Sequence, residues 1–70
     1  MTARELCRRF ERAGWTHVRT VGSHRRYQKT TRKGRTYGFP VPMHPGDLPG
    51  RIVHNAERVV EQARKEDEEG

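Results

Sequence analysis

The tripeptide Gly22-Ser23-His24 is the part of this sequence best suited to chemistry. Histidine has an unperturbed pKa close to neutrality, so an imidazole can accept or donate a proton under ordinary conditions. Glycine and serine favour turns, so they are expected to place His24 where a turn meets a strand. We therefore expect one proton-transfer group at an accessible position.

The charge around His24 is strongly positive. Eleven of the fifteen Lys and Arg residues lie in residues 1–35, which contain two acids, Glu5 and Glu11. Residues 65–70 contain four acids and one base, so the net charge of +6 understates the asymmetry along the chain. Basic surface of this density most often binds nucleic acid. A histidine that can transfer a proton, surrounded by positive charge, predicts a polyanionic substrate that the protein converts chemically and does not only bind.

The length of 70 residues predicts a single domain. A hydrophobic content of 30% predicts a thin core, and hence marginal stability or help from a partner or from self-association. The single cysteine, Cys7, cannot form an internal disulfide, which suits a reducing cytoplasm. No apolar run approaches the roughly 20 residues needed to cross a bilayer, and no helix pairs a bulky apolar face with a basic one. We therefore expect no membrane partner.

Residue periodicity predicts an α+β fold with the element order α-β-β-β-α. Thr2 and Glu5 form a capping-box pattern at the start of the first helix, and Gly14 suits the left-handed position after its end. Pro40 and Pro42 cannot donate to a β-ladder, so the third strand is expected at a sheet edge. The predicted elements are a helix over residues 3–13, strands over 16–21, 24–30 and 35–41, and a helix over 49–64.

These elements predict a three-stranded antiparallel sheet with both helices on one face and the other face open. Side chains alternate along a strand, so an inward Tyr27 would place His24, Arg26 and Gln28 on the open face. The domain is expected over residues 1–64, and residues 65–70 are expected to form a frayed acidic tail.

Several short motifs occur together in a particular order. They are Leu6 and Phe10, Gly14-Trp15, Arg19, Gly22-Ser23-His24, Tyr27, Val41-Pro42-Met43-His44, and Gly46-Asp47-Leu48-Pro49-Gly50. In order and spacing, over about residues 3–53, they resemble the HicA toxin family, small bacterial ribonucleases of type II toxin–antitoxin systems. The second helix departs from that family, because Gly50 is followed by Arg51-Ile52-Val53 rather than by a Gly-Thr-Leu-like start. This departure bears on partner binding more than on chemistry.

The resemblance implies a fold like that of double-stranded-RNA-binding domains. It implies metal-independent cleavage of messenger RNA, inhibition of translation, and a HicB antitoxin that covers the active site. The catalytic histidine of the family falls on His24, and its preceding turn residues fall on Gly22 and Ser23. No cofactor is implied.

The expected chemistry of His24 is general acid–base catalysis. The imidazole would remove the proton of a ribose 2′-OH or protonate the 5′ leaving oxygen. His44 matches a position where the family often has histidine, and it is the candidate for a second proton-transfer group. His54 is expected to be solvated, and His17 has no evident partner. No pair among these histidines and Cys7 has the short spacing of a zinc motif, so no metal is expected.

The densest run of positive charge holds six bases and no acid in eleven residues, and we predict that it contacts RNA phosphates. Its members are Arg25, Arg26, Lys29, Arg32, Lys33 and Arg35. A solvated hairpin without a ligand is the alternative interpretation. The arginines of the first helix suit either RNA or an acidic antitoxin. Two functions remain in view: an endoribonuclease toxin that uses His24, and a non-catalytic basic RNA-binding module that uses the same face.

Overall fold

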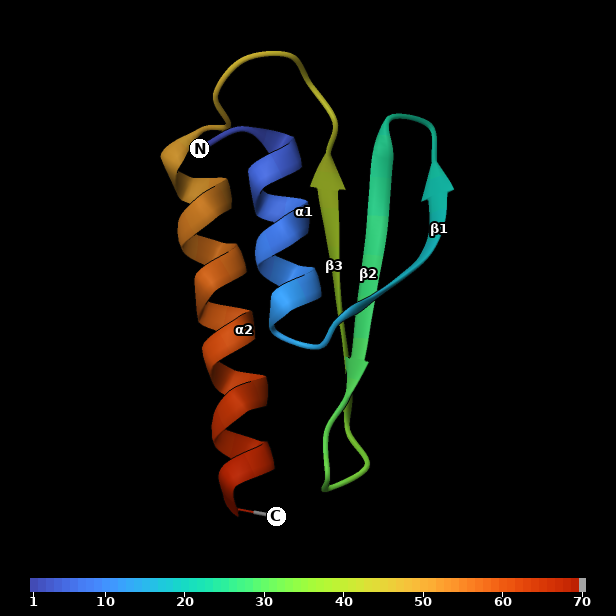
Figure 1. Cartoon of the computed structure of the whole chain (residues 1–70), viewed down its shortest axis with the longest axis vertical. Helices are drawn as coiled ribbons and strands as arrows, with labels where there is room; N and C mark the ends of the chain where they lie inside the picture. The colour runs from blue at the N-terminus through green and yellow to red at the C-terminus, as the bar shows by residue number, and fades with distance from the viewer. Residues whose placement is uncertain (70) are drawn as a thin grey trace.

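The computed structural model describes residues 1–69 of the chain and confirms the α+β arrangement (Figure 1). Three antiparallel strands form one open sheet in the order β1-β2-β3, and the two helices pack against it. No helix in this part of the chain is both long and apolar enough to cross a membrane. The elements are α1 (Ala3–Arg12), β1 (Thr16–Val21), β2 (His24–Thr30), β3 (Thr36–Pro42) and α2 (Gly50–Glu69).

Both ends of α1 follow the sequence signals. The Thr2 hydroxyl accepts a hydrogen bond from the Glu5 backbone N–H at 3.2 Å, and the Glu5 carboxylate accepts one from the Thr2 N–H at 2.8 Å. At the other end Gly14 has a positive φ of 88°. The N–H of Trp15 then reaches back to the carbonyl of Phe10 at 3.0 Å, which is the hydrogen bond of a Schellman motif. These caps fix where the chain turns toward β1.

Pairing in the sheet agrees with the predicted alternation. Tyr27 lies opposite His17 on β1 and opposite Phe39 on β3, and its side chain is fully buried. β3 pairs only with β2, so the edge position expected for this proline-containing strand is confirmed. It begins at Thr36 rather than residue 35, because the carbonyl of Arg35 still closes the turn by accepting the N–H of Thr31 at 2.8 Å.

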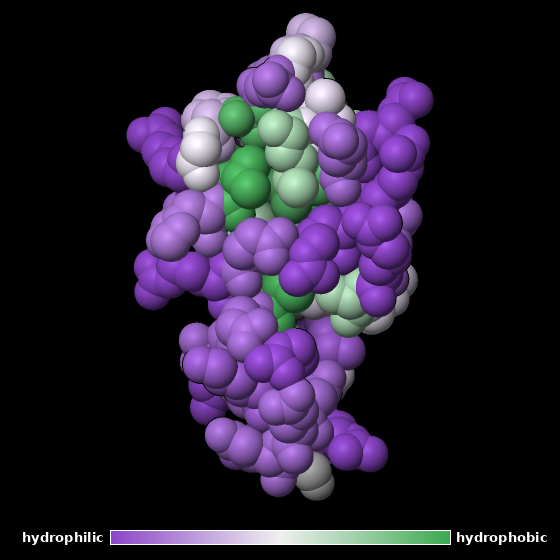
Figure 2. Space-filling view, turned by 60° about the vertical axis from the view of Figure 1, so that its left-hand side comes forward, coloured by the Kyte–Doolittle hydropathy of each residue, from purple (hydrophilic) through white to green (hydrophobic). Residues whose placement is uncertain are grey.

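The core is a small aromatic cluster centred on Phe10 of α1. The ring of Phe10 stacks on Tyr27 with a centroid distance of 5.6 Å and on Phe39 at 5.3 Å, and it meets Trp15 edge-on at 4.8 Å. Ala56 and other small residues of α2 complete the cluster from the side. On the helical side of the molecule the hydrophobic colour is gathered in the upper centre, with smaller areas near the middle, and polar side chains cover most of the rest (Figure 2). The cluster that joins the helices to the sheet contains eleven buried hydrophobic residues in the described part of the chain.

The prediction that the second helix ends near residue 64 and that a frayed tail follows is wrong. α2 continues to Glu69, and the acidic residues at its end are helical; residue 70 lies outside the described residues. Fraying was expected because terminal segments are poorly ordered unless other parts of the chain hold them. The structure instead places opposite charge beside these acidic residues.

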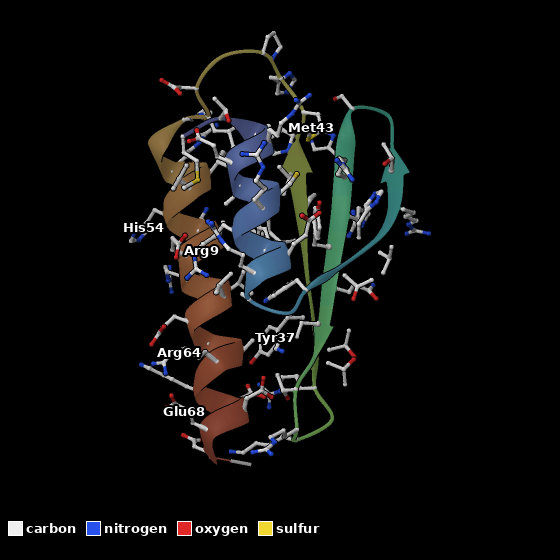
Figure 3. All side chains as sticks on the ribbon, viewed as in Figure 1. Arg9, Tyr37, Met43, His54, Arg64 and Glu68 are labelled. Carbon is white, nitrogen blue, oxygen red and sulfur yellow. The ribbon has the colours of Figure 1, made fainter. Side chains whose placement is uncertain are left out.

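Glu66 connects the end of α2 to the β2–β3 hairpin. Its carboxylate accepts hydrogen bonds from the hydroxyls of Tyr37 and Thr31, the latter at 3.0 Å, and it lies 3.7 Å from the guanidinium of Arg35. The pKa of Glu66 is lowered, chiefly by the hydrogen bond from Tyr37. Tyr37 extends from β3 toward α2 (Figure 3).

Asp67 and Glu69 make the remaining contacts with the hairpin. Asp67 accepts the backbone N–H of Arg32 at 2.8 Å and pairs with Lys29 at 3.2 Å, and the N–H of Arg32 is the main cause of its lowered pKa. Glu69 pairs with Lys33 at 2.7 Å, which raises the pKa of that lysine. By contrast, Glu68 pairs with Arg64 on the outer side of α2 (Figure 3). The acidic end of the helix is therefore bound to the hairpin through three carboxylates.

Replacing Phe10 with alanine should cost about 3–5 kcal/mol of the free energy of unfolding, because the ring is fully buried and three aromatic partners would lose their contact with it. Urea denaturation followed by circular dichroism would measure the loss. Val18→Ala is the matched control, since Val18 is 45% exposed, and it should change stability by less than about 0.5 kcal/mol. A loss below about 1 kcal/mol for Phe10→Ala would contradict this account of the core.

The contact of α2 with the hairpin should weaken in acid. A carboxylate whose pKa is lowered by folding adds stability above its unfolded pKa of about 4, and that stability is lost as the pH falls through the lower folded pKa. Glu66 and Asp67 both have lowered pKa values. The combined variant Glu66→Gln and Asp67→Asn should therefore melt below wild type at pH 7, and the two melting curves should converge toward pH 3. Glu68→Gln is the control and should follow wild type; equal melting curves for all three proteins at pH 7 would refute the prediction.

Candidate histidine site

A two-residue turn positions His24. Val21 and His24 are the last paired residues of β1 and β2, so only Gly22 and Ser23 connect the strands. Gly22 has a φ of +58° and Ser23 does not have a positive φ, as in the type II′ turn, which matches the right-handed twist of the strands. His24 is therefore the first residue of β2, held directly by the turn.

The structure brings His24 and His44 together. Their ring centroids are 6.4 Å apart and the rings are nearly perpendicular, although twenty residues separate them in the sequence. The two segments are held together by the β2–β3 pairing, in which His24 lies opposite Pro42, and by the N–H of Met43, which donates to the carbonyl of Ser23 at 2.7 Å. Both imidazoles are exposed. Two proton-transfer groups thus lie at one end of the sheet, where a solvent-borne molecule can reach both.

His24 lies on the open face of the sheet, as the alternation predicted. It has the parity of Arg26 and Gln28, opposite to the buried Tyr27. Arg26 is paired directly with Arg19 of β1. Two like charges opposite each other destabilise a sheet unless an anion offsets them. The open face therefore carries an imidazole next to two adjacent guanidinium groups.

Arg25 lies on the other face, toward the helices. Its guanidinium is 6.0 Å from the centre of the Tyr27 ring and donates to Nδ1 of His17 at 3.4 Å. His17 then carries its proton on Nε2 and donates to the Thr20 hydroxyl at 3.1 Å. Burial is the main cause that raises the pKa of Tyr27, whose hydroxyl donates to Glu11 at 3.0 Å. Arg25 and His17 thus have partners within the protein.

The structure separates the six predicted phosphate contacts. Arg26 alone lies beside His24 on the open face. Lys29 has the inward parity of Tyr27 and pairs with Asp67, while Lys33 and Arg35 pair with Glu69 and Glu66. The Arg32 side chain donates to the backbone carbonyl of Asp67 at 3.3 Å. Most of the positive charge in the hairpin is thus directed at α2 rather than at the histidines.

The remaining candidates lie away from the two imidazoles or inside the core. His54 is exposed on α2 and points away from the sheet (Figure 3). Cys7 is buried, and its thiol lies 3.7 Å from the sulfur of Met43. Within residues 1–69 no three His, Cys, Asp or Glu side chains come close enough together to hold a metal ion.

A groove beside His44 reaches the start of α1. Thr2, Arg4, Met43, His44 and Gly46 contribute to its lining. The N–H of Leu48 donates to the carbonyl of Met1 at 2.8 Å, which joins the loop after His44 to the N-terminal segment. Arg4 therefore lies on the helical side of the site, on the opposite layer from Arg26.

Residues 3–59 match the family described as the HicA toxin of bacterial toxin–antitoxin systems. The chain belongs to the HicA toxin family. Comparisons with curated proteins and with solved structures give no significant match. Membership identifies a toxin and implies that this HicA protein pairs with an antitoxin. The matched range contains β1, β2, β3 and both histidines of the pair, and it ends within α2.

In this HicA toxin the predicted phosphate contacts leave out Arg19 of β1 and include Lys29 of β2, which points to the other face. Arg19 was named only among the motifs that resemble the family and was not predicted to contact phosphate. Its cross-strand pairing with Arg26 makes it part of the open face. The bulge between His17 and Arg19 sets that pairing, and residue alternation alone cannot indicate a bulge. Lys29 could have been excluded from the predicted phosphate contacts on the open face, because it lies two residues from Tyr27 on β2 and therefore on the same, inward face.

Gly22→Ala should lower the free energy of unfolding by about 1–2 kcal/mol, because an L-residue is strained at a φ of +58°. It should also shift the NMR resonances of the His24 ring, since the turn sets the ring position. Gly50→Ala is the control: Gly50 begins α2 without a positive φ and nothing lies within 4 Å of an added Cβ. Unchanged stability and unchanged His24 resonances in Gly22→Ala would contradict the role given to the turn.

Proposed function

We propose that this HicA toxin is a metal-independent endoribonuclease that cleaves messenger RNA and thereby inhibits translation. The observation that supports it best is the pair of exposed imidazoles, His24 and His44, with ring centroids 6.4 Å apart. Cleavage of RNA by transesterification needs one group to take a proton and another to give one. The two histidines can supply both roles without a metal or a cofactor.

In the proposed reaction one neutral imidazole removes the proton of the ribose 2′-OH. The 2′ oxygen attacks the adjacent phosphorus, the bond from phosphorus to the 5′ oxygen breaks, and the other, protonated imidazole protonates that leaving oxygen. The products are a 2′,3′-cyclic phosphate and a 5′-hydroxyl end. Each histidine finishes in the protonation state in which the other began, so the pair is reset by proton exchange with water.

Arg26 and Arg19 are the proposed phosphate contacts on the open face. They are cross-strand neighbours, and Arg26 lies two residues from His24 on the same side of β2. Guanidinium groups bind phosphate oxygens in a forked geometry and stabilise the negative charge that grows on phosphorus oxygens during attack. Gly22 and Ser23 act through the backbone, by holding the first residue of β2 in place.

The antitoxin partner is proposed to be HicB-like and to cover the two histidines. Support comes from their position: both are exposed at one end of the sheet, and His24 adjoins β1, whose residues are all exposed. A partner that occupies this end would exclude RNA from the imidazoles. Messenger RNA as substrate implies that the protein acts in the cytoplasm.

The test is cleavage of a labelled single-stranded RNA in the presence of EDTA. Wild type should cleave it; His24→Ala should reduce the rate by at least about 10²-fold, and His44→Ala by about 10²–10⁴-fold. The rate for wild type should follow a bell-shaped pH profile, which loses one limb in each variant. Expression of His24→Ala should no longer arrest growth.

His54→Ala is the matched control, because this histidine is exposed on α2 away from the pair, and it should cleave like wild type. Circular dichroism should show that all variants keep the fold. Cleavage by His24→Ala at the wild-type rate would refute the catalytic role proposed for His24. Wild-type protein that binds RNA tightly without cleaving it would identify a non-catalytic RNA-binding module instead.

A further inference from the structure

Apart from the Arg19–Arg26 pair on the open face, two surfaces of the described chain carry concentrated positive charge, and one of these two is neutralised. The hairpin surface, formed by Lys29, Arg32, Lys33 and Arg35, faces the carboxylates at the end of α2, at distances that include 2.7 Å for Lys33 to Glu69 and 3.2 Å for Lys29 to Asp67. This end of α2 lies beyond residue 59, where the family match stops. The hairpin surface is therefore occupied by an anion that belongs to the chain itself.

The second surface is the α1 stripe, formed by Arg4, Arg8 and Arg12. The three arginines are spaced by four residues and are all exposed, so they follow one another along one side of the helix at steps of about 6 Å. Within the described part of the chain none of them takes part in an ion pair or a side-chain hydrogen bond. Arg9 differs, because it makes two hydrogen bonds with Glu57 of α2 at 3.1 and 3.0 Å.

The α1 stripe is continuous with the histidine site. Arg4 lines the same groove as His44, and the hydrogen bond from Met43 to Ser23 holds that groove against the turn before His24. A polymer that continues from His44 toward α1 would therefore meet Arg4 first and the other two arginines in succession. The hairpin surface is at the opposite end of β2, away from His24.

We propose that the RNA backbone leaves the histidine pair along α1, with its phosphates on Arg4, Arg8 and Arg12, and that the acidic end of α2 excludes RNA from the hairpin. This inference rests on the proposed nuclease function. Exposed like charges one helical turn apart destabilise a helix, and a phosphate chain offsets that repulsion. Arginine also holds phosphate through two parallel hydrogen bonds, which suits three successive contacts with one strand.

The experiment measures RNA binding in the His24→Ala background, so that cleavage does not interfere. Fluorescence anisotropy with a labelled single-stranded RNA gives the dissociation constant at several salt concentrations. Arg4→Gln, Arg8→Gln and Arg12→Gln together should weaken binding at least about tenfold at low salt. The slope of log affinity against log salt should fall in magnitude by about 2, because each lost phosphate contact on a single strand removes about 0.7.

The control removes the same number of charges from the hairpin: Arg32→Gln, Lys33→Gln and Arg35→Gln together. It should bind RNA within about twofold of the parent and with the same salt slope. Glutamine and arginine have similar helix propensities, so the α1 variant should keep its fold, which circular dichroism would check.

Equal losses in both triple variants would mean that only net charge matters and would overturn the proposal. An unchanged α1 variant would also overturn it and would leave the stripe as a surface for an acidic protein. These outcomes do not depend on catalysis. Conversely, wild-type protein that binds RNA along α1 but does not cleave it would refute the nuclease function and leave the path of the strand intact.

Discussion

The stacking of Phe10 on Tyr27 determines which face of the sheet carries His24. Tyr27 is fully buried under α1, and alternation along β2 then forces the residues one and three positions before it to the opposite side. Arg26 and His24 are those residues. A slip of one residue in this strand would send the imidazole under the helix and bring the phenol into water. One aromatic contact in a thin core thus sets the orientation of the chemistry.

Charge, rather than apolar burial, organises the far end of the molecule. The core ends near Ala63 of α2, and beyond it Glu66, Asp67 and Glu69 hold the helix to the hairpin. Individual exposed ion pairs stabilise little, but here the hydroxyls of Tyr37 and Thr31 and a backbone N–H also donate to the carboxylates. The asymmetry of the sequence, basic at the start and acidic at the end, is largely resolved inside one molecule.

The fold was predictable because its signals are local. The capping pattern of Thr2 and Glu5 located the start of α1, Gly14 located its end, and alternation around Tyr27 placed His24 on the open face. These features depend on neighbouring residues or on a period of two or about four. Local patterns are therefore enough to give the element order and the face on which each residue of β2 lies.

The rest depends on contacts between distant residues, which composition cannot locate. Residues 65–70 were predicted to form a frayed acidic tail, because nothing local shows that Arg32 and Lys33, more than thirty residues earlier, lie beside Asp67 and Glu69. The cross-strand pairing of Arg19 with Arg26 depends on a bulge that has no clear sequence signal. The approach of His44 to His24 was suggested by a resemblance only, since it requires the final strand to be in register.

The backbone hydrogen bond from Met43 to Ser23 can form only after the ribosome has synthesised β3. His24 emerges early, but its partner imidazole is fixed only after β3 has added to the sheet and the loop behind it has closed. Contacts between residues far apart in sequence form late, because the loop entropy is lost before they can stabilise the chain. A ribosome-bound fragment that stops before β3 therefore lacks the two-histidine arrangement altogether. If both rings are needed for toxicity, the unfinished chain is harmless to the cell that makes it.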